Sequence, residues 1–410
     1  MAERPISYRD LLGIADIPEL LAAAALSRLA GNMSSLAIIL YALERFSSPT
    51  LVGWLSFALV GPGLVASPLA GALLDRMGPV FAVAVDMAVS AALIVVLIVA
   101  DRFGWTSPTV LLVLVAAFSL TSPLSRAGIR TLLPRLVPSH ALDRANAVDT
   151  AIYATTDVLG PGVTGLLVGF LGPTSAFIAI AFAYAGATVL VSALRRLPRP
   201  APSKASLMQQ TLEGIAAVAR EPTLRGLAIS YSLYQVTWGV LVVVVPVFAV
   251  REFPTGIGSS VAGFLWAAAG LAGGIGALVA GHLQTAGRER NVMAAGMLVV
   301  ALASWPIAAE FGFGGLAAGL LIAGALSGPI DVGLLSLRQR RTDPNQFGRV
   351  LSVSMSLNIL GFPVGSALAG MLITHSLSAA FLLAGLASAL GAAAAMAIPR
   401  HAKAERESPP

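Results

Sequence analysis

The chain has 410 residues, of which 57% are hydrophobic and only 11% are charged, roughly half the charged share of a soluble protein. A soluble globule of this composition would leave a large apolar surface in water, so the composition excludes that class and favours a membrane protein. The formal charge of +6 comes from arginines that are spread along the chain without aromatic clusters. This pattern excludes a nucleic-acid interface and suits anionic lipid headgroups.

Twelve apolar stretches divide the sequence, and each is close to the length of about 20 residues that crosses a bilayer. We therefore predict an all-α membrane protein. The expected membrane-spanning helices are 18–43, 50–74, 81–101, 108–125, 147–171, 174–194, 226–249, 259–282, 291–311, 314–336, 350–373 and 377–397.

The longest polar segment separates six predicted spans from six others. We expect a six-helix bundle over 1–194, a cytoplasmic central loop over 195–225, a second bundle over 226–398 and a disordered tail over 399–410. The two halves are similar at an offset of roughly 200 residues, and this spacing pairs Leu159-Gly160-Pro161 with Leu360-Gly361-Phe362-Pro363. Internal repeats of this kind are typical of secondary transporters, whose substrate site lies at the midplane.

The basic residues predict the orientation. They concentrate in the tails and in every second connection, whereas the other connections hold only Arg45, Arg102 and Arg251. Arginine in short loops marks the cytoplasmic face, so both termini are expected to be cytoplasmic. The Ala- and Gly-rich spans are typical of a GC-rich bacterial genome, and we expect a multi-pass protein of the bacterial inner membrane, with anionic headgroups on its cytoplasmic side.

The segment 71–78 reads Gly-Ala-Leu-Leu-Asp-Arg-Met-Gly, between the second and third spans. It resembles the signature G-x-L-x-D-R-x-G of the major facilitator superfamily, and the two six-helix bundles are the fold that this resemblance implies. It also implies a gate that contains Gly71, Asp75, Arg76 and Gly78. An anion at the C-terminal end of a helix needs a cation, for which Arg126 and Arg130 are the candidates. The alternative is that Asp75 and Arg76 are solvated loop charges. The chain departs from the family pattern at Pro79-Val80, where basic residues are usual.

The fifth span contains Gly160, Pro161 and Gly165, which resemble the GP-x-x-G element of exporters in that superfamily. Pro161 removes a backbone donor and bends the helix, and the glycines permit close packing. Plain helix-packing glycines are the alternative interpretation. The basic loops resemble the branch that includes enterobactin exporters and drug efflux pumps. However, residues 114–120 of the fourth span lack the arginine that drug–proton antiporters of the superfamily often carry there.

Ionisable residues within spans are functional candidates because they are costly in lipid. Arg28 and Asp157 each lie about ten residues into their spans, and we hypothesise that they form an ion pair near the midplane whose carboxylate exchanges a proton. A static pair is the alternative. Asp331 in the tenth span is either a cation contact or a second proton site. Its alternative is an ion pair with Arg338, on the same helical face, near the inner edge of the membrane.

The seventh span carries a polar and aromatic stripe of Tyr231, Tyr234, Gln235 and Trp238. In lipid such a stripe faces protein or a cavity, and its chemistry suits a bulky amphipathic substrate. Asn32, one turn from Arg28, is a further cavity candidate. Helix–helix packing is the alternative for the stripe.

No phosphate-binding loop, metal-ligand spacing, nucleophile or cofactor motif is present in the sequence, so we expect neither an enzyme nor a cofactor. The pattern predicts a secondary active transporter that works by alternating access. Its expected partners are protons and a small amphipathic molecule (a drug, siderophore or metabolite) that it exports. Uptake of a metabolite by the same fold is one alternative, and a non-transporting membrane sensor or scaffold is another.

Overall fold

The computed structural model describes residues 7–138, 141–195, 215–254, 256–282, 287–342 and 347–399. Within these ranges the regular structure is helical, and twelve helices are long and apolar enough to cross a membrane. The predicted fold class and span order are therefore confirmed. Several helices extend beyond the predicted spans at their polar ends, most clearly the fourth, because the arginine-rich segments there continue the helix.

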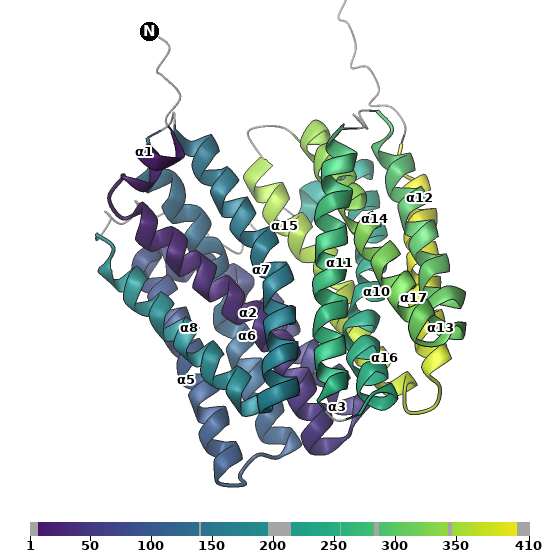
Figure 1. Ribbon diagram of the computed structural model, residues 1–410. Coiled ribbons are helices and arrows are strands. Elements are labelled where there is room, and N and C mark those ends of the chain that lie inside the picture. The colour runs from purple at the N-terminus through teal and green to yellow at the C-terminus, as the bar shows by residue number, and fades with distance from the viewer. Residues whose placement is uncertain are drawn as a thin grey trace, which may run out of the picture. The chain divides into compact units, whose positions relative to one another are not determined.

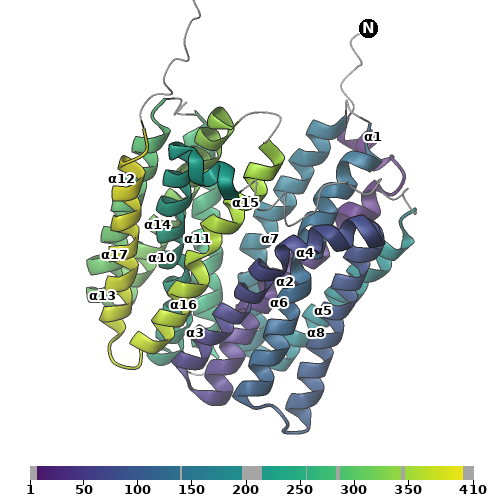
Figure 2. The ribbon, with the colours of Figure 1, turned by 180° about the vertical axis from the view of Figure 1, so that it is seen from behind.

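The first eight helices can be followed in Figure 1 and Figure 2, and α4 is labelled in Figure 2. Serine side chains cap three of them. Ser7 accepts from the backbone nitrogen of Asp10 at the start of α1. Ser48 accepts from that of Leu51 and Ser107 from that of Val110, each ahead of a proline at the first helical position. The helices are α1 (Tyr8–Leu12), α2 (Ile17–Phe46), α3 (Pro49–Ala58), α4 (Gly61–Met77), α5 (Pro79–Arg102), α6 (Pro108–Leu136), α7 (Leu142–Leu171) and α8 (Pro173–Ala193).

The remaining helices follow the central segment, of which residues 196–214 lie outside the described ranges. The described end of that segment packs through Val218 against Leu224, Val353 and Leu357. The helices are α10 (Pro222–Glu252), α11 (Ile257–His282), α12 (Glu289–Leu302), the π-helical turn η2 (Ala303–Ile307), α13 (Ala308–Glu310), α14 (Gly312–Arg341), α15 (Phe347–Ile359), α16 (Gly361–Leu372) and α17 (Leu377–Met396).

Three spans that we predicted as continuous are broken. The second divides between α3 and α4 just before Pro62, a break that can be followed in Figure 2, and the eleventh divides between α15 and α16 just before Pro363. The ninth is interrupted at η2, where Trp305 leaves helical geometry ahead of Pro306. A proline lacks the backbone donor and crowds the preceding turn, which explains a break at each site.

The chain forms two compact units, and each is assembled from two segments. Unit 1 comprises Met1–Leu207 and Pro246–Ala267, and unit 2 comprises Met208–Val245 and Ala268–Pro410. In unit 1, α2 packs against α7 and α8, and α6 against α4 and α5. In unit 2, α12 packs against α14 and α17. The two six-helix bundles that we expect on either side of the central segment stay a prediction.

Candidate functional site

A buried ion pair joins α2 to α7. Arg28 Nη2 lies 2.8 Å from Asp149 Oδ1, and Arg28 Nη1 donates to the Asp149 carbonyl oxygen at 3.0 Å. The guanidinium also lies over the Tyr153 ring, 3.7 Å from its centroid. The predicted pairing of Arg28 with Asp157 is therefore wrong in this structure. Both carboxylates lie on one face of α7, eight residues apart, and the nearer one takes the cation.

Asp157 has a neutral partner instead. Asn32 Nδ2 donates to Asp157 Oδ1 at 2.8 Å, and among the described residues no ion pair includes Asp157. The Asp157 side chain is exposed. Gly160, one turn further along α7, fixes this register, because a Cβ there would lie 2.6 Å from the Asn32 Cβ. Asn32 and Asp157, both predicted as site residues, thus lie together.

The remaining glycine of the GP-x-x-G element contacts α11 within unit 1. A Cβ on Gly165 would lie 2.8 Å from the Gly263 Cα and from the Ser259 carbonyl oxygen. Ser260 Oγ donates to the Gly165 carbonyl oxygen at 3.1 Å. Pro161 is inside α7, and its carbonyl oxygen faces Gly263. This arrangement fits the packing interpretation of the element, since only glycines allow the two backbones to approach so closely.

The structure describes part of the predicted gate. The side-chain surroundings of Gly71 and Asp75 lie outside what it describes, while Arg76 is exposed at the end of α4. Gly78 joins α4 to α5 with φ of 84°, a conformation that favours glycine. Arg126 and Arg130 are both exposed on α6, and Arg130 lies 5.7 Å from the Tyr153 ring centroid.

One residue that sequence reasoning missed lies beside this turn. Gly128 on α6 packs so closely that a Cβ would collide with Val83 Cγ2 and lie 3.2 Å from Leu74 Cδ2. The segment between α4 and α5 is therefore held against α6, between Arg126 and Arg130. In the sequence, Gly128 stands two residues after Arg126 and two before Arg130, and this pattern could have indicated the contact.

In unit 2, the Tyr231 hydroxyl donates to Asp331 Oδ1 at 2.5 Å, and the Asp331 side chain is exposed. The alternative that paired Asp331 with Arg338 near the inner edge is wrong for this structure. Arg338 is buried, and its Nη2 donates to the side-chain oxygen of Asn358. The Asn358 amide nitrogen donates in turn to the Ser354 carbonyl oxygen at 3.1 Å. Asn358 was not predicted, although it aligns with Asp157 at the offset of the internal repeat.

The predicted aromatic stripe on α10 is continuous. The ring centroids of Tyr231 and Tyr234 are 5.7 Å apart, and those of Tyr234 and Trp238 are 6.4 Å apart, both in edge-on geometry. Tyr231, Gln235 and Trp238 are half-buried, but Tyr234 is fully buried. Tyr234 is therefore not a cavity-lining residue in this structure, which corrects its prediction as one. Its ring packs against those of Tyr231 and Trp238 instead.

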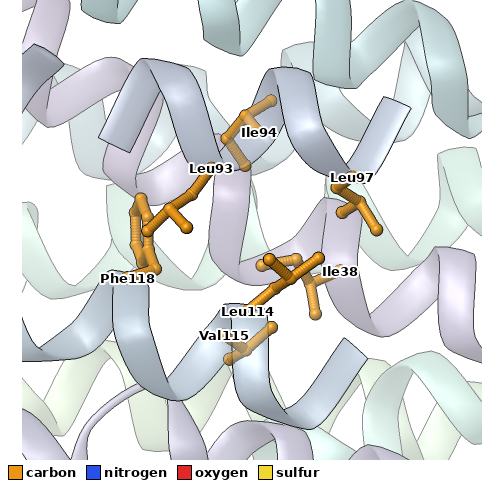
Figure 3. Close-up of a pocket in the computed structure, with 7 residues that line it drawn as sticks. All are labelled: Ile38, Leu93, Ile94, Leu97, Leu114, Val115 and Phe118. Carbon is orange, nitrogen blue, oxygen red and sulfur yellow. The ribbon is translucent and has the colours of Figure 1, made fainter. Parts of the chain in front are cut away.

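A small apolar cavity of about 10 Å³ lies within unit 1 among α2, α5 and α6 (Figure 3). Its lining consists of hydrocarbon side chains, from Ile38, Leu93, Ile94, Leu97, Leu114, Val115 and Phe118. Ligand pockets are usually some 300 Å³ or more, so this cavity is a packing defect and not a substrate site.

Comparison with known proteins places these features in a family context. The family model described as "Major Facilitator Superfamily" matches residues 20–254 and 227–410. The chain is 59% identical over 400 residues to an uncharacterized MFS-type transporter, y4rN, of Sinorhizobium fredii, covering 98% of this chain and 99% of that protein. It is 28% identical over 363 residues to the multidrug efflux pump Tap of Mycolicibacterium fortuitum, covering 85% and 87%.

Solved structures show the same fold at low sequence identity. The crystal structure of the nucleoside transporter NupG matches with a TM-score of 0.78 and 13% identity, covering 93% of this chain and 99% of that one. The peptide transporter POT matches with a TM-score of 0.73 and 15% identity, covering 96% and 98%.

Proposed function

The chain belongs to the major facilitator superfamily of transporters, and within that family we propose that it is a proton-coupled exporter of small amphipathic molecules. The observation that carries the proposal is Asp157, a carboxylate at membrane depth with an amide as its hydrogen-bond donor. A charged group at this depth faces the protein interior or a water-filled cavity, where a proton can reach it.

The Asn32 amide suits a carboxyl group that gains and loses a proton. When Asp157 is ionised, the amide nitrogen of Asn32 donates to it, at 2.8 Å in this structure. When Asp157 is protonated, its hydroxyl can donate to the amide oxygen of Asn32, because an amide offers both a donor and an acceptor. Neither protonation state leaves the carboxyl group without a partner, so protonation requires no separation of α2 and α7.

Arg28 forms no ion pair with Asp157, because its guanidinium contacts other residues of α7. The guanidinium is bonded to Asp149 and stacked on Tyr153, and its side chain is only 9% exposed. A direct ion pair would hold Asp157 ionised, since an opposite charge favours the charged form of a carboxyl group. The structural pair between Arg28 and Asp149 therefore leaves Asp157 available for proton exchange.

The similarity to Tap, which is described as a multidrug efflux pump, supports export. From the distribution of arginine we propose that both termini are cytoplasmic. Alternating access is the mechanism we propose, and uptake of a metabolite is the competing direction.

The test uses purified protein in liposomes that contain a pH-sensitive dye, with an imposed pH gradient and a panel of amphipathic cations, anions and siderophores. We expect at least one compound to discharge the gradient only when intact protein is present. Asp157→Asn keeps the hydrogen bond to Asn32 and removes the titratable group. It is therefore expected to abolish substrate-driven proton movement and to retain downhill substrate flux.

The matched control is Asp101→Asn. Asp101 lies at the end of α5 and accepts a hydrogen bond from the Tyr41 hydroxyl at 2.6 Å, so the change is chemically the same at a place with no proposed role in coupling. Full proton coupling in the Asp157→Asn protein would refute the coupling role. Accumulation assays in intact cells decide the direction: lower internal substrate in expressing cells supports export, and higher internal substrate supports uptake.

A further inference from the structure

Asp331 is an exposed carboxylate within a spanning helix, and its hydrogen-bond donor is an aromatic side chain. Its side chain is exposed on α14, and its Oδ1 accepts the Tyr231 hydroxyl from α10 at 2.5 Å. Among the described residues no ion pair includes Asp331. An exposed carboxylate within a spanning helix does not face acyl chains, so this surface is open to water or to a ligand.

The surroundings give Asp331 a hydrogen bond but no counter-ion among the described residues. A phenol that donates to a carboxylate makes a charge-assisted hydrogen bond. The cation on the same face of α14, Arg338, is buried and bonded to Asn358. The negative charge at Asp331 is therefore left for a partner that is not part of the described chain.

Aromatic rings stand next to this charge. Tyr231, the donor to Asp331, is half-buried and meets Tyr234 edge-on, and Tyr234 meets Trp238 in the same way. Tyr234 is fully buried, so it fixes the positions of the two partly exposed rings. Rings whose faces are electron-rich attract organic cations, and a nearby carboxylate adds a full opposite charge.

We propose that Asp331, Tyr231 and Trp238 form a subsite in unit 2 that binds the positively charged group of an organic cation. Asp331 supplies the charge, the two rings supply apolar and cation–π contact, and Arg338 donates to Asn358 and forms no ion pair with Asp331. The inference rests on the proposed transport function and narrows its substrate class to lipophilic ammonium or phosphonium compounds. A purely structural Tyr231–Asp331 hydrogen bond, which only joins α10 to α14, is the competing explanation.

The experiment measures saturable binding of radiolabelled tetraphenylphosphonium to the full-length protein in lipid nanodiscs, with excess unlabelled ligand as the blank. Tetraphenylborate has nearly the same shape and the opposite charge. Its own saturable binding is measured in separate samples, because the two ions form an insoluble salt when they are mixed. We expect tetraphenylphosphonium to bind and tetraphenylborate not to bind. Asp331→Asn should weaken binding at least tenfold, which corresponds to about 1.4 kcal/mol. Asp331→Glu, which keeps the charge, should retain binding.

Two further variants separate the subsite from a general effect of tyrosine–aspartate pairs. Tyr231→Phe keeps the ring and loses the hydroxyl, and we expect a smaller loss of affinity than for Asp331→Asn. Asp101→Asn removes the charge from the equivalent Tyr41–Asp101 pair in unit 1 and should leave binding unchanged. Size-exclusion profiles verify that each variant is folded.

Three outcomes overturn the proposal: no saturable binding of tetraphenylphosphonium to wild-type protein, equal binding to folded Asp331→Asn protein, or equal saturable binding of tetraphenylborate. The proton-flux assay answers a different question. Asp331-dependent binding with no proton flux would preserve the subsite and reject proton-coupled transport. Proton-coupled flux together with binding that does not depend on Asp331 would support proton-coupled transport and reject the subsite.

Discussion

Removing the charge of Asp149 should destabilise the protein through Arg28, although neither residue is proposed to touch substrate. The side chains are only 13% and 9% exposed, and the charged atoms are 2.8 Å apart. At an effective dielectric constant of 20 their gross attraction is about 6 kcal/mol. Loss of hydration offsets much of it, and measured couplings between residues in contact are about 0.5–3 kcal/mol. We therefore expect a coupling of about 2 kcal/mol.

The assay is a double-mutant cycle with Arg28→Met and Asp149→Asn, read as the free energy of unfolding in mixed detergent micelles. Each single variant should be destabilised, because it leaves a buried charge without its partner. The double variant should recover part of the loss. A second cycle, Arg28→Met with Asp157→Asn, should show a coupling below about 0.5 kcal/mol, as for residues that are not in contact. Strong coupling in the second cycle and none in the first would refute the assignment of partners.

Three other perturbations test different parts of the fold. Gly165→Leu should overpack the contact between α7 and α11 and cost about 1–3 kcal/mol, measured as a lower midpoint of thermal unfolding, whereas Gly162→Ala, whose nearest neighbour is Ala267 Cβ at 3.6 Å, should have little effect. Gly128→Val should destabilise the protein similarly, because it displaces the turn between α4 and α5, and unchanged stability would contradict that packing. Hydrogen bonds from Ser7 lower the pKa of Asp10 below its ordinary value of 3.8. Its contribution to α1 is therefore complete above that value and lost as pH falls through the lower folded-state pKa, which hydrogen exchange of α1 should show as loss of protection only in acid.

Span number and order were predictable because the bilayer imposes a length and a hydropathy that few other structures share. The breaks within spans were not. Pro62, Pro306 and Pro363 all accompany a break, but Pro123, Pro134, Pro161, Pro246 and Pro329 lie inside continuous helices. A proline removes one hydrogen bond wherever it stands, and the packing of neighbouring helices decides whether the helix continues.

The choice of partners within the site depends on axial register between helices, which a single sequence does not specify. Counting residues from the start of each span placed Arg28 level with Asp157. In the structure, the close approach of Gly160 to Asn32 sets the register of α2 against α7, and Arg28 then meets Asp149. Spacing alone identified the aromatic stripe on α10, but not that Tyr234 is its buried member.

Because unit 1 is built from two separate segments of the chain, we can predict how the protein behaves when it is produced as two fragments. Residues 246–267 run from the last turns of α10 into the first part of α11. They belong to this unit although they follow the central segment in the chain. A polypeptide that stops at residue 207 would lack part of its own packing surface, including Gly263 opposite Gly165. Two fragments produced from separate messages should therefore depend on each other for folding. Co-expression should rescue the first fragment from degradation, and expression alone should not.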